Sequence, residues 1–184
     1  MGRPKRVIKA NTTYHSFTRC RNLENYFSNR YFKAVVSQVI IYALTRYKFE
    51  LNAFIIMPNH LHLAITTVNN KDTISRIMQL IKSMIAKRMN KLLGIKGPFW
   101  NERFGSRFVY YFPALCSYFA YNPLRWGLVK HAREWEFGSY DVYRKKNGKC
   151  NIDITMHKHF LALGDTLEEC FRKQLEIDEY FMCQ

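Results

Sequence analysis

Apolar and polar residues alternate in several segments of the chain, a pattern that predicts β-strands. Residues 12–19 alternate loosely and are rich in β-forming side chains, and residues 49–56 and 60–67 are two further apolar segments separated by a Pro-Asn pair. Proline fixes φ and asparagine tolerates turn geometry, so this pair predicts a turn between two adjacent strands. Residues 104–112 predict a fourth strand.

Two longer segments place apolar side chains at every third or fourth position, which is the spacing of one face of an α-helix. They cover residues 32–44 and about 72–93, and the second turns lysine and arginine side chains to its other face. Pro113 suits the first turn of a third helix, where its missing N–H loses no partner. We expect that helix to end near Asn122, because a residue that precedes proline avoids helical geometry.

These segments occur in the order strand, helix, strand, strand, helix, strand, helix. That order predicts an α+β sandwich, in which helices pack on one face of an antiparallel β-sheet and the other face is left available. After Asp141 the pattern weakens into an exposed loop and two short helices, the second indicated by the capping-box spacing of Thr166 and Glu169. We expect one domain over residues 1–143, and a loop with an acidic helical extension over residues 144–184.

Charge changes the picture, because the chain is strongly basic. It carries 29 Lys and Arg against 14 Asp and Glu, and only 3 of the basic residues but 7 of the acidic ones lie in residues 151–184. Such an excess indicates a polyanionic partner, above all nucleic acid.

The apolar segments are too short or too interrupted to span a membrane, and no signal peptide is visible, so we expect a soluble, cytoplasmic, nucleoid-associated protein without a membrane partner. Five cysteines without CxxC spacing predict reduced thiols.

Candidate chemistry begins with His60 and His62, which are one residue apart in a predicted strand. Side chains alternate across a strand, so both imidazoles are expected on one face, as in a metal site. Two neutral imidazoles need a further polar ligand from elsewhere. Tyr118 and Asn122 are four residues apart on the third predicted helix, where such a pair is offset by only about 40°. Asn122 is therefore a candidate ligand and Tyr118 a candidate nucleophile.

Other histidines show how little the spacing proves by itself. His157 and His159 have the same spacing but flank a lysine in a predicted helix, where such side chains diverge, so we predict that they lie on the surface. For His15 and His131, which have no ligand partner in the sequence, we expect ordinary packing or exposure.

Four blocks of sequence resemble the REP-associated tyrosine transposases, which belong to the HUH single-strand nucleases. They are YHSFTR at residues 14–19, MPNHLHL at 57–63, YFAYNPLRWGLV at 118–129 and WEFGSY at 135–140. The resemblance runs from about residue 8 to residue 143, in the order that the family shows. It implies an antiparallel sheet of the HUH type, close to that of the RRM.

The resemblance also implies an activity and a site. A tyrosine would cut single-stranded DNA near hairpins such as REP elements, keep a 5′-phosphotyrosine link and free a 3′-hydroxyl. By position, Tyr118 would be the nucleophile, and His60, His62 and Asn122 would hold Mg²⁺ or Mn²⁺. A phenol with a pKa of about 10 is a poor nucleophile at pH 7 until a cation polarises the phosphate. Related enzymes include dimers in which the tyrosine serves the partner's metal site, so monomer and homodimer both stay open.

The chain departs from this family at two positions. Trp126 stands where a small residue is usual. Tyr121 lies three residues from Tyr118, offset by about 60° the other way, and is a second candidate nucleophile. Only Tyr118 falls on the tyrosine of the family, so it is favoured.

Basic and aromatic residues are interleaved in residues 99–108, as expected where arginines meet phosphates and rings stack on unpaired bases. The predicted DNA contacts are Arg3, Lys5, Arg6, Arg19, Arg21, Trp100, Arg103, Arg107 and Arg125.

Two other functions compete with this interpretation. A non-catalytic nucleic-acid-binding module of RRM-like fold would carry an aromatic pair on its central strands, and residues 49–56 lack an obvious one. A metal-dependent phosphodiesterase that uses water would gather Asp and Glu ligands, and no such cluster is apparent.

Overall fold

A computed structural model describes residues 7–145, 147–148 and 150–183, so the predicted DNA contacts Arg3, Lys5 and Arg6 lie outside the described residues. The elements are, in chain order, β1 (Thr12–Arg19), η1 (Arg21–Leu23), η2 (Tyr26–Ser28), α1 (Arg30–Arg46), β2 (Phe49–Ile56), β3 (His60–Thr67), α2 (Ile74–Leu93), β4 (Gly105–Phe108), α3 (Phe112–Arg125), η3 (Ala132–Glu134), η4 (Asp141–Tyr143), α4 (Lys158–Leu161) and α5 (Leu167–Met182).

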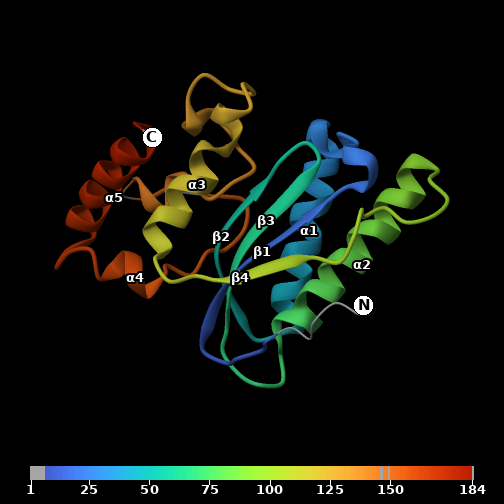
Figure 1. Cartoon of the computed structure of the whole chain (residues 1–184), viewed down its shortest axis with the longest axis horizontal. Helices are drawn as coiled ribbons and strands as arrows, with labels where there is room; N and C mark the ends of the chain where they lie inside the picture. Colours follow the sequence, from blue (N-terminus) through green and yellow to red (C-terminus); the bar gives the residue numbers. More distant parts are fainter. Residues whose placement is uncertain (1–6, 146, 149, 184) are drawn as a thin grey trace.

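The four strands form one antiparallel sheet in the order β2-β3-β1-β4 (Figure 1). The register pairs Arg19 with His60 and Phe17 with His62 across β1 and β3, and Phe17 with Gly105 across β1 and β4. The bounds of β1, β2 and β3 are those predicted from the alternation, and β4 is shorter than expected. The register matters because it places side chains of β1 beside the histidines of β3.

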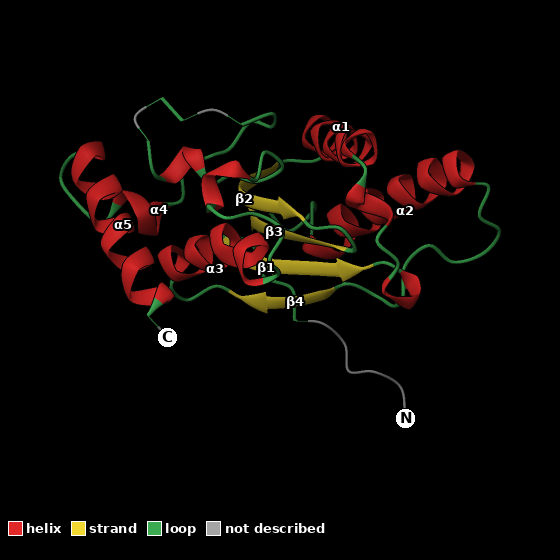
Figure 2. Ribbon diagram, turned by 90° about the horizontal axis from the view of Figure 1, so that it is seen from above, coloured by secondary structure: helices red, strands yellow, loops and turns green. Residues whose placement is uncertain are grey.

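Helices α1 and α2 pack on one face of the sheet, on the opposite side from α3 (Figures 1 and 2). Leu61, Leu63 and Ile65 of β3 point to the α1 and α2 side, where they join the larger core. Ala64 points the other way and packs in a second apolar cluster with residues of α3. The predicted α+β sandwich is confirmed, with α1 and α2 covering one face, but the expectation that the other face is left available was wrong. The other face is partly covered by α3 and the C-terminal segment, and this is the face of the histidines.

Helix α3 runs past the end predicted for it. The chain stays helical through Pro123 to Arg125, so the prediction of an end near Asn122 was wrong. Proline removes one backbone donor, but Asn122 and Pro123 are buried, and the following amides bond back into the last turn, from Trp126 to the Asn122 carbonyl at 3.3 Å and from Leu128 to the Pro123 carbonyl at 3.0 Å. Packing therefore outweighs the local preference of a residue before proline.

The C-terminal segment packs against α3 and the sheet. Helix α5 covers 16 residues, so the expectation of two short helices was wrong for the second, although Oγ1 of Thr166 accepts a bond from the Glu169 amide as the capping spacing predicted. His157 lies just before α4 and is buried, so its predicted surface position was also wrong. Its ring stacks on Phe112 with centroids 4.2 Å apart.

Within the described residues, no helix combines the length and the apolar character that crossing a membrane needs.

Candidate active site

The histidine pair occupies the start of β3. His60 and His62 point to the face opposite Leu61 and Leu63, and their ring centroids are 4.9 Å apart with perpendicular planes. The period of two along a strand puts both imidazoles on one side, as the sequence predicted. The two rings are therefore close enough to share one ion.

Each imidazole is held through its Nδ1 atom. Nδ1 of His60 donates to Oδ1 of Asn59 at 2.7 Å, and Nδ1 of His62 lies 2.9 Å from Nε2 of His15, with one proton shared between them. When Nδ1 of His62 donates in that bond, the Nε2 atoms of His60 and His62 both carry lone pairs that can bind a cation. Metal-binding histidines are usually oriented in this way, with the second nitrogen bonded to a neighbouring polar group.

Burial keeps these imidazoles neutral. It lowers the pKa of His60 to about 4, with a contribution from Arg19, and the pKa of His15 to about 4, with a contribution from Arg107. The pKa of His62 is lowered well below its usual value, mainly by burial and then by the neighbouring His60. Neutral imidazole is the form that binds a cation, so the site is prepared for one at pH 7.

Helix α3 carries two polar groups of the candidate site, and the first of them, Tyr118, contacts the histidines. The half-buried ring of Tyr118 has its centroid 5.5 Å from that of His62 and 5.9 Å from that of His15. Asn122, one turn further along, is only 4% exposed, and its Oδ1 atom has no hydrogen-bond partner among the described residues. An amide oxygen buried without a partner costs about 1–3 kcal/mol. A cation held between Asn122 and the two imidazoles would satisfy it, so these residues fit a metal.

The donor set contains no carboxylate. Among the residues that the structure describes, no group of three His, Cys, Asp or Glu side chains is arranged to hold a metal ion. The fit therefore depends on the amide oxygen of Asn122 as the third ligand. A mixed set of imidazole nitrogen and amide oxygen suits a divalent cation that does not require sulfur ligands.

Tyr121 belongs to a different environment. Its pKa is raised to about 12, first by burial and then by the charge of Asp178 on α5, with Tyr140 contributing from the loop before η4. These neighbours lie on the side of α3 that faces the C-terminal segment, away from the histidines. A phenol that ionises less readily and lies off the site is a poor nucleophile, which favours Tyr118.

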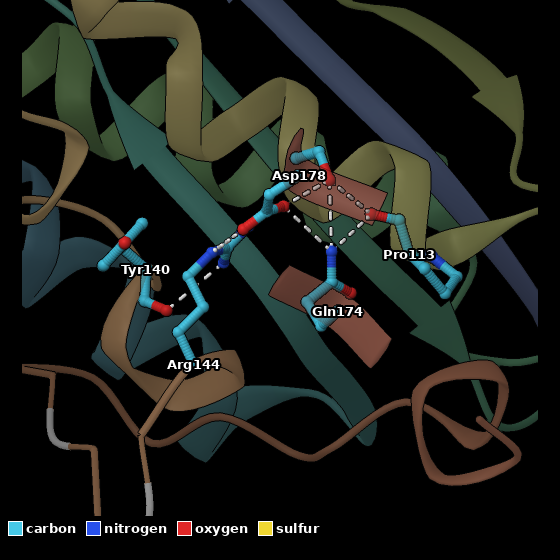
Figure 3. A network of polar contacts seen from close by, with 6 residues as sticks. Pro113, Tyr140, Arg144, Gln174 and Asp178 are labelled. Carbon is cyan, nitrogen blue, oxygen red and sulfur yellow. Dashed lines mark hydrogen bonds and ion pairs between the residues drawn. The ribbon is translucent and has the colours of Figure 1, made fainter. Parts of the chain in front are cut away.

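A buried polar network holds α3 in place (Figure 3). Both carboxylate oxygens of Asp178 accept bonds from the guanidinium of Arg144, at 2.6 Å from Nε and 2.8 Å from Nη2. Oδ1 of Asp178 also accepts a bond from Ser117 Oγ at 2.6 Å, and Gln174 Nε2 donates to the Pro113 carbonyl at 3.2 Å. Since Ser117 is next to Tyr118, the network ties α5 to the helix that carries the candidate nucleophile. No local pattern predicts this ion pair, because its partners are 34 residues apart.

Two of the predicted DNA-binding arginines border the site. Arg19 pairs with His60 and Arg107 with His15 across the strands, so both emerge on the face of the histidines. Both are exposed. Arg21, Arg103 and Arg125 are also exposed, and the guanidinium of Arg125 covers the ring of Phe181 with 4.7 Å to its centroid.

Trp100 does not lie where a base could stack on it. It is 9% exposed, its Nε1 atom donates to the Lys82 carbonyl at 2.9 Å, and its ring contacts Phe99 and Phe27 in the core. The prediction that Trp100 contacts DNA is therefore contradicted by its burial. An interleaved basic and aromatic segment does not tell which rings turn inward.

His15 and Phe17 are site residues that the sequence reasoning missed. His15 was expected to be ordinary, yet it orients His62. Phe17 is half-buried, and a Cβ atom at Gly105 would lie 2.3 Å from its ring, so a larger residue at this position would displace the ring. The alternation of β1 was the available signal, because it puts His15, Phe17 and Arg19 on one face. Which face that is depends on the pairing with β3.

A sheet that carries an HxH pair, faced by a helix with a tyrosine, defines the class of HUH tyrosine nucleases. The sequence profile of the family described as IS200-like transposases matches residues 8–110 of the chain, which is more than half of it. The chain belongs to this family, and a non-catalytic binding module is not favoured. The matched segment includes His60 and His62 and ends before α3.

A solved structure supports the fold. The chain is similar to a REP-associated tyrosine transposase bound to a REP hairpin, with a TM-score of 0.66, 23% identity, and coverage of 86% of this chain and 96% of the other. A putative transposase from Deinococcus radiodurans R1 matches less well, with a TM-score of 0.42, 18% identity, and coverage of 59% and 85%. No curated protein matches the chain.

Proposed function

We propose that this transposase cuts and rejoins single-stranded DNA through Tyr118, beside a divalent cation held by His60, His62 and Asn122. The observation that carries this proposal is the convergence of α3 and β3. Tyr118 lies against His62, and the unpartnered buried oxygen of Asn122 lies one turn further along the same helix. A candidate nucleophile and a candidate cation site thus lie side by side.

The proposed chemistry is a transfer of one phosphodiester. The phenolic oxygen of Tyr118 forms a bond to phosphorus and loses its proton to solvent, while the bond from phosphorus to the 3′-oxygen breaks and that oxygen takes up a proton. The downstream strand stays on Tyr118 through its 5′-phosphate, and a 3′-hydroxyl reverses the step to rejoin DNA. The bound cation, Mg²⁺ or Mn²⁺, would withdraw charge from the phosphate so that a phenol can attack it.

The neighbouring residues of the chain support this step. His15 and Asn59 orient the two imidazoles, and burial holds the imidazoles in the neutral form. Arg19 and Arg107 border the site on the same face and would bind the phosphates on either side of the one that is cut. Arg21, Arg103 and Arg125 would contact the backbone further away.

The proposed substrate is single-stranded DNA that carries a hairpin of the REP type. The support is the solved transposase of the same fold, which is bound to a REP hairpin. The strong basic excess fits a nucleic-acid partner. A cytoplasmic, nucleoid-associated location is part of the proposal, because that is where such DNA is found.

We also propose that Tyr118 acts on the histidines of its own chain. Helix α3 packs on the sheet that carries His60 and His62, and the ring of Tyr118 contacts both His62 and His15. A mixture of Tyr118→Phe with a His60→Ala, His62→Ala variant tests this. Such a mixture should stay inactive, and activity in the mixture would mean that two chains exchange the tyrosine.

One experiment tests the function and separates its rivals. The protein is mixed with single-stranded oligonucleotides that carry a hairpin, with Mg²⁺ or Mn²⁺, and a covalent adduct is sought. Trypsin should release residues 108–125 with the nucleotide attached to Tyr118. A pure binding module would give no adduct. An enzyme that uses water would give cut DNA free of protein.

A further inference from the structure

An open groove of about 250 Å³ borders the candidate metal site. His60 lines it together with Leu23, Pro58, Asn59, Trp126 and Leu128. Three of these apolar side chains are unusually exposed, Trp126 at 67%, Leu23 at 57% and Leu128 at 43%. A cluster of exposed large apolar groups beside a polar site indicates a binding surface.

The chain itself places Trp126 in this position. Tyr118, Asn122 and Trp126 follow one another at intervals of four residues, so they form a row along α3 with steps of about 6 Å. Trp126 directly follows the helix, and its backbone amide bonds to the carbonyl of Asn122 at 3.3 Å. The backbone of Trp126 is therefore held one turn beyond the candidate ligand Asn122, and its indole is exposed to solvent.

The nucleophile and the groove lie next to different histidines of the candidate cation site. The ring of Tyr118 contacts His62, whereas the other imidazole, His60, lines the groove with Trp126. The cation site thus lies between the nucleophile and the groove. In a phosphoryl transfer the attacking and leaving oxygens are roughly in line on opposite sides of phosphorus. With Tyr118 on one side, the leaving 3′-oxygen and its nucleotide are directed toward the groove.

We propose that this groove binds the nucleotide on the 5′ side of the cut phosphate, with its unpaired base stacked on Trp126. The proposal rests on the proposed function and adds to it a residue that positions the leaving strand. Base stacking on aromatic rings is a main source of affinity for single-stranded DNA. The charge of the surroundings fits this occupant, since Arg19 lies across the strand pair from His60 and the chain carries a formal net charge of +15.

Photochemical cross-linking tests the position of the base. The probe is a hairpin-bearing single-stranded oligonucleotide in which 5-iodouracil replaces one base at a time around the position cut by the wild-type protein. Irradiation is done with Tyr118→Phe, so that the DNA stays intact. We expect the strongest cross-link from the base on the 5′ side of the cut, on the tryptic peptide of residues 126–130, which contains Trp126. The covalent adduct of the proposed function falls on a different peptide, residues 108–125, so the two results are read separately.

Affinity measurements with matched variants give a second test. Trp126→Ala should weaken binding of the intact oligonucleotide about 5- to 150-fold, and Trp126→Phe should lose much less because it keeps a ring. Tyr180→Ala is the control, since Tyr180 is a similarly exposed aromatic residue on α5, at 70%, and its removal should change affinity by less than about twofold. When the oligonucleotide has an abasic position on the 5′ side of the cut, wild type and Trp126→Ala should bind equally.

Three results would overturn the proposal. One is a cross-link on residues 126–130 that is equally strong from every position, or absent from all of them. Another is an effect of Trp126→Ala that persists with the abasic oligonucleotide. The third is a loss of self-association in Trp126→Ala without any loss of DNA affinity, because the groove would then be covered by a second copy of the chain.

Discussion

Nε2 of His15 lies 2.9 Å from Nδ1 of His62. His15 on β1 is not itself a candidate ligand, but this bond orients the candidate ligand His62 on β3. The two residues are 47 positions apart and meet through the pairing of β1 with β3. Because the ring of His62 also packs against Tyr118, this bond connects the cation site to the nucleophile. His15 is thus a positioning residue for the site.

Replacement of His15 by alanine should weaken metal binding about 10- to 100-fold, as loss of such a supporting bond usually does. The affinity for Mn²⁺ can be measured by calorimetry, and the rate of adduct formation can be followed as metal is added. Adduct formation should recover at high metal concentration, since the ligands and Tyr118 remain. The control is His131→Ala at an exposed histidine. Equal metal affinity of His15→Ala and wild type would show that His15 does not orient the ligand.

Tyr118→Phe should lower formation of the covalent adduct by about a thousandfold or more, because the nucleophilic oxygen is removed. Tyr121→Phe should retain it, since that phenol lies toward Asp178 and its pKa is raised to about 12. Mass spectrometry of tryptic peptides gives the amount and position of the adduct. If Tyr121→Phe loses the adduct while Tyr118→Phe keeps it, the assignment of the nucleophile is reversed.

Asp178→Ala should lower the free energy of unfolding by about 3–5 kcal/mol, because it leaves the guanidinium of Arg144 buried without its partner. Urea denaturation measures the change. Glu136→Gln is the matched control, since its ion pair with Arg30 is largely exposed and should contribute at most about 1 kcal/mol. If Asp178→Ala is as mild as the control, the network of Figure 3 does not hold α5 on α3.

Acid should destabilise the protein through His157, which lies outside the candidate site. Burial lowers its pKa to about 4 in the folded state, while the unfolded chain has the usual value of 6.5. Between these two values the unfolded state binds more protons, so the free energy of unfolding falls as pH drops from about 6.5 to about 4 and levels off below. The contribution of His157 should be on the order of 1–3 kcal/mol.

His157→Phe provides the test of this pH dependence, because it keeps the stacking on Phe112 and removes the titrating group. The variant loses the contact with Oγ1 of Thr13, so its stability at pH 7 should be lower. Between pH 7 and pH 4 its stability should fall less steeply than that of wild type, as measured by denaturant titrations at each pH. Parallel curves for the two proteins would mean that His157 does not titrate as inferred.

Local sequence determined the elements and part of the site. The alternation of β1, β2 and β3 set their bounds, and a period of two put His60 and His62 on one face. The spacing of Tyr118 and Asn122 predicted that both would emerge together from α3. These features depend on contacts within a few residues along the chain, and a periodic pattern records them directly.

Tertiary structure decided the other features of the site, because those features depend on which surfaces of the chain pack together. The register of β1 with β3 made His15 a site residue, and the packing of α2 turned Trp100 into the core. Burial of Asn122 and Pro123 allows α3 to continue past its predicted end. The carboxylate of Asp178 on α5 binds Ser117 of that helix, although the two residues are 61 positions apart in the sequence. No local pattern records these contacts, since each is selected by the free energy of packing surfaces that are far apart in the chain.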